Sequence, residues 1–194
     1  MSSEEIRSFI AIDLPEEVKT ELTSLQAGLK SGSRASVRWV NPGSIHLTLK
    51  FLGNIDSGLT DSIVSAMEEA VSSVHSFRIK VKGLGAFPNL RKVNIIWVGL
   101  EGDIKRLQLL QSRIDSVLVP FGFKPESRPF TPHLTLARLR DYVTPDERLK
   151  LGQLIAETTF ESDFSLYINA VNLMKSQLTR EGPIYSRIGS VKLK

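Results

Sequence analysis

One tetrapeptide, His-Leu-Thr-Leu, occurs twice in this chain of 194 residues, starting at His46 and at His133. The two copies lie 87 positions apart (133 − 46) and use two of the three histidines that the chain contains. With 25 Leu and 10 Thr in the chain, Leu-Thr-Leu would follow a given histidine by chance on the order of one time in a thousand. The repeat therefore indicates an internal duplication, and the fold must accommodate two related units.

Each copy of the motif has the alternation of a half-buried β-strand. Successive side chains of a strand point to opposite faces, so His46 and Thr48 are predicted to share one face while the two leucines pack into the core. The second copy gives His133 and Thr135 the same arrangement. If a pseudo-twofold axis relates the two units, both histidine–threonine pairs converge on one cleft.

The rest of the chain alternates between helical and strand patterns. Apolar residues recur at helical spacing in four segments, which are 13–29, 59–74, 104–117 and the segment that begins at 144. Asp13 is predicted to cap the first of these helices, and the sequence TPDE at 144–147 to begin the last. Strand-like runs lie between them at 7–12, 37–40, 45–53, 76–87, 93–100, 164–176 and 183–189.

This order of elements, without a linker-like segment, predicts a single domain over residues 1–194. We expect an α+β fold of two pseudo-symmetric lobes, each an antiparallel sheet with helices packed outside, facing a central cleft. Each lobe should contain one copy of the motif.

Composition narrows the possible chemistry. The chain has no cysteine, which excludes disulfides, cysteine-ligated zinc and a thiol nucleophile. The balance of 25 Lys and Arg against 21 Asp and Glu gives a net charge of +4, which permits a phosphate-bearing partner without requiring one. No stretch has the roughly 20 apolar residues of a membrane span, and the first residues lack a secretory pattern. We therefore expect a soluble, cytoplasmic protein that does not bind membranes.

Two histidines that face one ligand can act as an acid–base pair. An imidazole titrates near pH 6.5, so one ring can accept a proton while the other donates one. Threonine hydroxyls can donate hydrogen bonds to phosphate oxygens, so this set suits displacement at phosphorus. A metal site is the weaker alternative, because two histidines without cysteine or a nearby carboxylate leave a zinc ion short of ligands. A single His-x-Thr would be an ordinary strand sequence, but the matched pair favours a functional role.

Two cationic side chains follow the motifs. Lys50 has the parity of His46 and Thr48, so it is predicted to point into the cleft and bind phosphate. Arg138 lacks the parity of the second motif and would reach the cleft only if the strand ends or bulges after Leu136. On strand geometry, Arg138 as a solvated charge and Arg138 as a phosphate ligand both stay open. His75 has no partner motif and is predicted to face solvent.

The two motifs in their sequence context resemble the paired His-x-Thr-x signatures of the two-histidine phosphoesterase superfamily. The closest resemblance is to the RNA 2′,3′-cyclic phosphodiesterases, long called 2′-5′ RNA ligases. It rests on segments that stand in the order of that family, namely RSFIAIDLP, RWVNPGSIHLTLKFLG, GLGAFPN, WVGL and PFTPHLTLARL. The resemblance implies hydrolysis of RNA 2′,3′-cyclic phosphate ends to a phosphomonoester, with the 2′-phosphate as the expected product and reversible 2′-5′ ligation at the same site.

The resemblance also implies roles for individual residues. His46 corresponds to the proton donor and His133 to the proton acceptor, while Thr48, Thr135 and Arg138 correspond to phosphate ligands. No metal or nucleotide cofactor is implied. The expected partner is RNA with a 2′,3′-cyclic phosphate end, for example a tRNA fragment, and the expected state is a monomer. Two alternatives remain: an enzyme acting on a small nucleotide such as ADP-ribose cyclic phosphate, and a non-catalytic binder of RNA or nucleotide.

Overall fold

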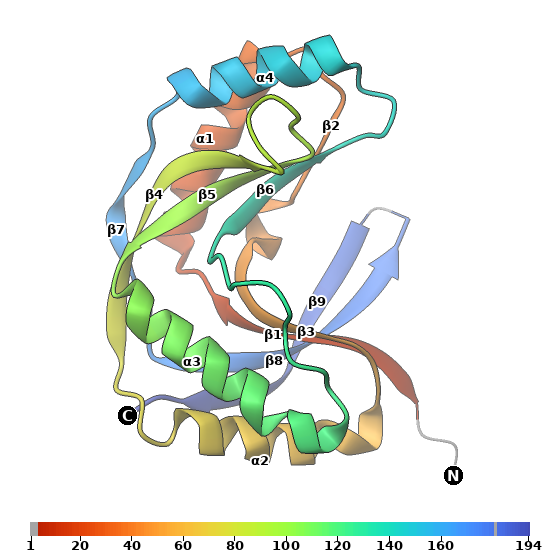
Figure 1. Ribbon diagram of the computed structural model, residues 1–194, viewed down its shortest axis with the longest axis vertical. Coiled ribbons are helices and arrows are strands. Elements are labelled where there is room, and N and C mark those ends of the chain that lie inside the picture. The colour runs from red at the N-terminus through yellow and green to blue at the C-terminus, as the bar shows by residue number, and fades with distance from the viewer. Residues whose placement is uncertain (1–3, 181) are drawn as a thin grey trace.

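The computed structural model describes residues 4–180 and 182–194, and in this part of the chain the strands form one antiparallel sheet (Figure 1). The order of strands across the sheet is β7-β4-β5-β6-β3-β1-β8-β9, with β2 also paired to β6. The strands are β1 (Glu5–Asp13), β2 (Val37–Trp39), β3 (His46–Asp56), β4 (Phe77–Phe87), β5 (Ile95–Gly102), β6 (Leu134–Leu139), β7 (Glu161–Ile168), β8 (Ala170–Thr179) and β9 (Gly182–Lys192).

The sheet is nearly divided at its middle. β3 and β6 are joined in register at Leu47 and Leu134 alone, whereas β1 and β3 pair over most of their lengths. Two lobes result, β3-β1-β8-β9 on one side and β7-β4-β5-β6 with β2 on the other, and Figure 1 shows them facing each other. The predicted α+β architecture with two facing lobes is confirmed. Each lobe nevertheless takes strands from both halves of the chain.

The helices cover the outer sides of the two lobes (Figure 1). They are α1 (Glu16–Gly32), α2 (Thr60–Val71), α3 (Ile104–Val117) and α4 (Pro145–Glu157), with short 3₁₀ helices η1 (Pro42–Ser44), η2 (Ser57–Leu59) and η3 (Val119–Phe121). α2 and α3 pack together on β9 and β3, while α1 and α4 pack on β7 and β4. The opposite face of the sheet in each lobe is left for the site. No helix in the described part of the chain is long and apolar enough to cross a bilayer.

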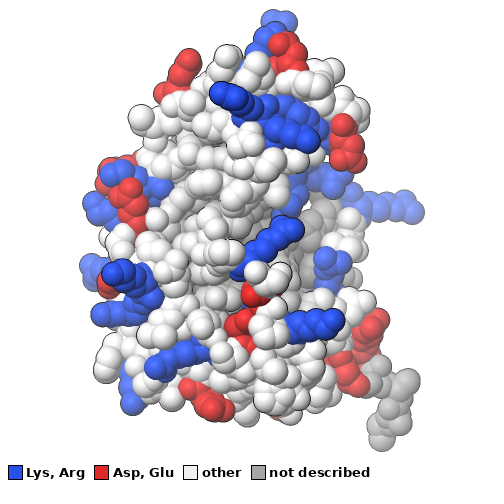
Figure 2. Space-filling model, in the orientation of Figure 1, with Lys and Arg blue, Asp and Glu red and all other residues white. Residues whose placement is uncertain are grey.

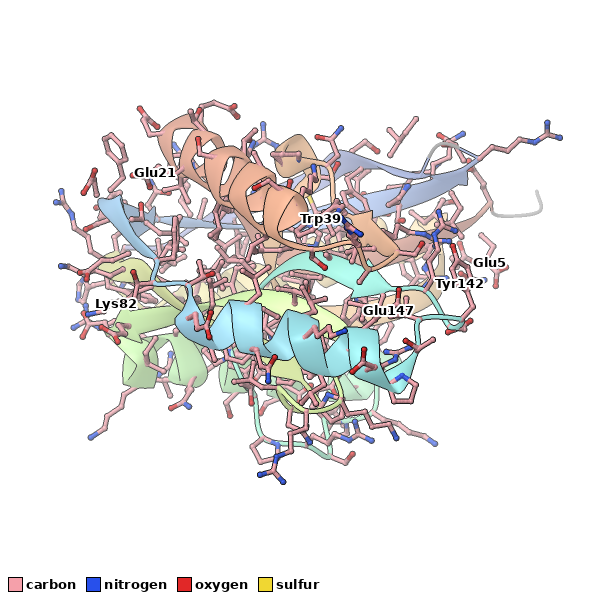
Figure 3. All side chains as sticks on the ribbon, turned by 90° about the horizontal axis from the view of Figure 1, so that it is seen from above. Glu5, Glu21, Trp39, Lys82, Tyr142 and Glu147 are labelled. Carbon is pink, nitrogen blue, oxygen red and sulfur yellow. The ribbon has the colours of Figure 1, made fainter. Side chains whose placement is uncertain are left out.

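The helix starts differ in one respect from the sequence prediction. α1 begins at Glu16, so the predicted N-cap role of Asp13 is wrong. Asp13 is the last residue of β1, and its carboxylate accepts a hydrogen bond of 2.9 Å from Asn172 Nδ2. The predicted capping box at the start of α4 is confirmed, with Thr144 and Glu147 bonded to each other reciprocally. Figure 3 shows Glu147 near the start of that helix. His75 is exposed, as predicted.

Candidate active site

The two copies of the motif meet where the lobes join. Leu47 of β3 lies opposite Leu134 of β6 in an antiparallel pair. This register places His46 and His133 diagonally, on either side of the leucine pair. The duplicated histidines, far apart in sequence, therefore come from adjacent strands at the centre of the molecule.

The burial of the two motif strands follows the same pattern residue by residue. The histidine and threonine of each motif are half-buried, and both leucines of each motif are buried. His46 and Thr48 thus share one face of β3, as His133 and Thr135 do at the start of β6. This orientation is the one that the alternation predicts.

Both imidazole rings are oriented by the same backbone contact. Nδ1 of His46 lies 2.8 Å from the carbonyl oxygen of Ser44, and Nδ1 of His133 lies 2.7 Å from the carbonyl oxygen of Thr131. Because a carbonyl oxygen can only accept, Nδ1 carries the hydrogen in each neutral ring. Nε2, on the other side of each ring, is the atom left for proton transfer.

Aromatic side chains surround His46. The ring of Phe9 stacks on it with centroids 4.6 Å apart, and the ring of Tyr185 meets it edge-on at 5.1 Å. Burial lowers the pKa of His46 below 6.5, although the hydrogen bond to Ser44 and the charge of Asp13 oppose the change. The neutral ring is therefore favoured in the free protein.

A different aromatic pair holds His133. Phe87 of β4 meets its ring edge-on at 5.0 Å, and the Trp97 ring of β5 lies tilted at 6.3 Å. Trp97 lies directly opposite Thr135 in the β5–β6 pair. Sequence reasoning missed all four aromatic residues around the histidines, because their positions depend on which strands pair and in what register.

Both motif strands bulge at the same point. Leu49 has no partner in the β1–β3 register, and Leu136 has none in the β5–β6 register. A bulge reverses the alternation of side chains beyond it. The residue after each bulge, Lys50 or Ala137, is therefore buried, and the next residue, Phe51 or Arg138, is exposed.

The prediction that Lys50 faces the cleft is wrong. The bulge at Leu49 turns Lys50 to the helix side, where it is only 3% exposed and forms an ion pair with Asp115 of α3. Its ammonium group also donates to the carbonyl oxygen of Lys124 at 2.9 Å. Lys50 thus joins β3 to α3 and to the chain segment beyond it, and does not lie with the motif threonines.

Arg138 lies on the same face as Thr135, although strand alternation without a bulge predicts the opposite face. The bulge at Leu136 gives its exposed side chain the orientation of Thr135. Burial raises the pKa of the Tyr185 hydroxyl, and the charges of Arg138 and Arg7 oppose that rise. The charge of Arg138 on β6 thus reaches the hydroxyl of Tyr185 on β9, a strand of the other lobe.

This arrangement suits proton transfer around an anionic group. Two imidazoles, two hydroxyls and one guanidinium lie on one face of the motif strands, where those strands meet. Within residues 4–180 and 182–194 no group of three or more His, Cys, Asp or Glu side chains could hold a metal ion.

Comparison with known proteins finds relatives that span nearly the whole chain. The model of the LigT-like phosphoesterase family matches the chain twice, over residues 12–97 and 98–185, so each match contains one motif. An RNA 2′,3′-cyclic phosphodiesterase of Methanothermobacter thermautotrophicus is 35% identical over 93% of this chain and 95% of its own length. One of Methanocaldococcus jannaschii is 34% identical over 94% and 98%. The structure of Escherichia coli LigT complexed with 3′-AMP is 25% identical, with a TM-score of 0.77 over 98% of this chain and 99% of that one.

Proposed function

The chain belongs to the LigT-like phosphoesterase family, and on that premise we propose that it hydrolyses RNA 2′,3′-cyclic phosphate ends, with His46 and His133 as its acid–base pair. One observation carries the proposal: both rings donate from Nδ1 to a backbone carbonyl and keep Nε2 for proton transfer. The names of the relatives, RNA 2′,3′-cyclic phosphodiesterases, support the choice of substrate.

The proposed reaction is one displacement at phosphorus. Nε2 of neutral His133 accepts a proton from water as the water oxygen bonds to phosphorus. The bond from phosphorus to the 3′-oxygen breaks, and Nε2 of protonated His46 gives that oxygen its proton. The products are a 2′-phosphate and a free 3′-hydroxyl. The strained five-membered ring lowers the demand on the catalyst, so two histidines suffice.

The remaining side chains act on the charged phosphate. The hydroxyls of Thr48 and Thr135 donate hydrogen bonds to its non-bridging oxygens, and the Arg138 guanidinium balances the charge that builds up in the transition state. A guanidinium suits this role because it stays charged and can donate two parallel hydrogen bonds to a phosphate.

The donor role of His46 depends on bound substrate. Burial lowers its pKa in the free protein, which disfavours the protonated ring that a donor needs. An anionic phosphate beside the ring acts in the opposite direction, because a nearby negative charge favours the imidazolium. We therefore propose that substrate and proton bind His46 together.

The same displacement can form a bond between two RNA strands. If a 5′-hydroxyl replaces water as the nucleophile, loss of the 3′-oxygen leaves a 2′-5′ linkage. Water is present at far higher concentration, so we propose hydrolysis as the dominant outcome and ligation as its minor, reversible counterpart.

The active unit in this proposal is a monomer in the cytoplasm that acts on RNA fragments such as those of tRNA. Both histidines and both threonines come from one chain, so the chemistry needs no second copy. Sedimentation equilibrium of the active protein tests the monomer, and a dimer at assay concentration would contradict it.

A short RNA ending in a 2′,3′-cyclic phosphate tests the proposed reaction. Incubation in EDTA should give the 2′-phosphate, identified by phosphorus NMR. The reaction should persist in EDTA, because two imidazoles without a third ligand do not make a metal site. No product, or activity that returns only with an added divalent ion, would overturn the proposal. Cleavage of ADP-ribose cyclic phosphate but not of RNA would identify a small-nucleotide enzyme.

A further inference from the structure

Two arginines lie opposite each other on neighbouring strands beside the second motif. β2 pairs with the second half of β6, and Arg38 is directly opposite Arg138. Val37 and Trp39, which flank Arg38, pack against the core, and Lys30 of α1 lies over the Trp39 ring at 5.3 Å. Figure 3 shows Trp39 next to the end of α1. Arg38 therefore points away from the helices, to the same face as Arg138.

A third arginine continues this row. The backbone N–H of Arg140 donates to the carbonyl oxygen of Ser36 at 3.3 Å, so the β2–β6 pairing extends past the ends of the strands. Arg140 is two residues from Arg138 and shares its face. All three arginine side chains are exposed.

Arg38, Arg138 and Arg140, called the arginine row below, lack a carboxylate within ion-pair distance in the part of the chain that the structure describes. Among the described residues, neither Arg38, Arg138 nor Arg140 forms an ion pair, although exposed lysines elsewhere, such as Lys82 and Lys150, do. Like charges directly opposite each other on neighbouring strands destabilise a sheet. The Arg38–Arg138 pair is therefore a cost in the free protein, and a bound anion would remove it.

The position of Arg38 separates it from the reacting phosphate. Arg138 and Thr135 pair with residues of β5 that are only two positions apart, because Leu136 is bulged out. With a rise of about 3.3 Å per residue and strands about 4.8 Å apart, the Arg38 backbone therefore lies roughly 8 Å from that of Thr135. Arg138 lies between them. A phosphate held by Thr135 and Arg138 therefore leaves Arg38 for another anionic group. Figure 2 shows Lys and Arg side chains along both sides of the hollow between the lobes.

We propose that Arg38, opposite Arg138, binds a second phosphate of the substrate: the phosphodiester that links the terminal nucleotide to the preceding one. The inference rests on the proposed function and adds to it. The enzyme then needs at least two nucleotides for full affinity. Each guanidinium can hold two oxygens of one phosphate, so adjacent phosphates of one strand satisfy the pair.

Equilibrium binding of two product analogues tests this site directly. Wild-type protein should bind a dinucleotide with a terminal 2′-phosphate about tenfold more tightly than a nucleoside 2′-phosphate. Arg38→Gln should remove that advantage and lower the slope of log K against log salt by about 0.7. Arg38→Lys should keep the slope and lose part of the affinity, because a lysine ammonium cannot make the bidentate hydrogen bonds of a guanidinium. Arg106→Gln on α3 removes the same charge far from the cleft and should change neither value.

The nature of the second phosphate is tested with wild-type protein. A dinucleotide with an uncharged methylphosphonate link should bind like the nucleoside 2′-phosphate. Equal losses for both analogues in Arg38→Gln would mean that Arg38 only positions Arg138, and would overturn the inference. If Arg38 raises the affinity for ADP-ribose 2′-phosphate as much as it raises that for the dinucleotide, the site binds a diphosphate and not the phosphodiester of RNA, which would overturn the inference. Absence of hydrolysis with the binding advantage intact would refute the proposed function alone.

Discussion

Leu49 and Leu136 hold the same place in the two halves of the molecule, each as the unpaired residue of a bulge directly after His-Leu-Thr. Because both bulges reverse the side-chain alternation, the next exposed residue lies beside the motif histidine and threonine. That residue is Phe51 in one lobe and Arg138 in the other. Matching backbones thus present an apolar ring on one side of the cleft and a cation on the other.

Replacing either histidine should remove most of the activity. His46→Ala and His133→Ala should each lower kcat by about 10²- to 10⁴-fold, the usual contribution of a general acid or base. Steady-state hydrolysis of an RNA cyclic phosphate measures the loss. Thermal unfolding provides the control, since His46 packs between Phe9 and Tyr185 and its loss should also lower stability. Near-wild-type turnover in either variant would refute the paired mechanism.

Lys50 should matter for stability and not for phosphate binding. Lys50→Met leaves Asp115 without its cation in a largely buried position, which should cost about 3–5 kcal/mol of unfolding free energy. KM for the cyclic phosphate should stay unchanged at temperatures where the variant is folded. The double variant Lys50→Met with Asp115→Leu should recover much of the stability, because no unpaired charge remains. A raised KM with normal stability in Lys50→Met would contradict this and would mean that Lys50 binds the phosphate.

Strand periodicity predicted the orientation of the motif side chains correctly only as far as the bulges. His46, Thr48, His133 and Thr135 lie before them and have the predicted orientation. Neither bulge is marked by a glycine or proline, so the alternation rule continued past each one and gave the wrong face for the next charged residue, Lys50 or Arg138. The rule does not detect a bulge whose residues are two buried leucines.

Strand pairing limited the prediction further. The helices were predictable because each carries its own apolar stripe, as Val18, Leu22 and Leu29 show in α1. By contrast, Phe9 and Tyr185 reach His46 through the order β3-β1-β8-β9, in which strands from both chain ends adjoin. The sequence of a single strand does not determine which strands lie next to it, so these contacts could not be predicted.

Gly85 should be required for the position of Trp97. A β-carbon at Gly85 would lie 2.2 Å from Cζ2 of the indole, so Gly85→Val must displace that ring from its place near His133. We expect kcat/KM to fall roughly 10- to 100-fold, as small misplacements of catalytic groups do. Gly28→Ala in α1 is the control, because its new β-carbon would meet no atom within 4 Å beyond its chain neighbours and the backbone of its own helix. Full activity in Gly85→Val would mean that Trp97 does not support His133.

The pH dependence should differ between the free and the substrate-bound protein. The proposed donor, His46, must be protonated, and burial lowers its pKa below 6.5 in the free protein. The falling limb of kcat/KM, which reports the free protein, should therefore begin below that of an ordinary histidine. Bound phosphate raises the pKa of His46, so the falling limb of kcat should lie at higher pH. Rate profiles for both parameters test this, and coincident limbs would contradict it.

Such profiles give pKa values for the pair and do not say which ring holds which proton. A substrate with sulfur in place of the bridging 3′-oxygen of the cyclic phosphate makes the assignment. A thiol has a pKa near 8.5, so the thiolate leaves without a proton. The sulfur substrate should therefore restore His46→Ala to within about tenfold of wild-type turnover, as general-acid loss predicts, and leave His133→Ala inactive. Release of the thiol, followed by a colorimetric thiol reagent, measures both. Rescue of His133→Ala instead would exchange the two roles, and rescue of neither would mean that one of these histidines only binds.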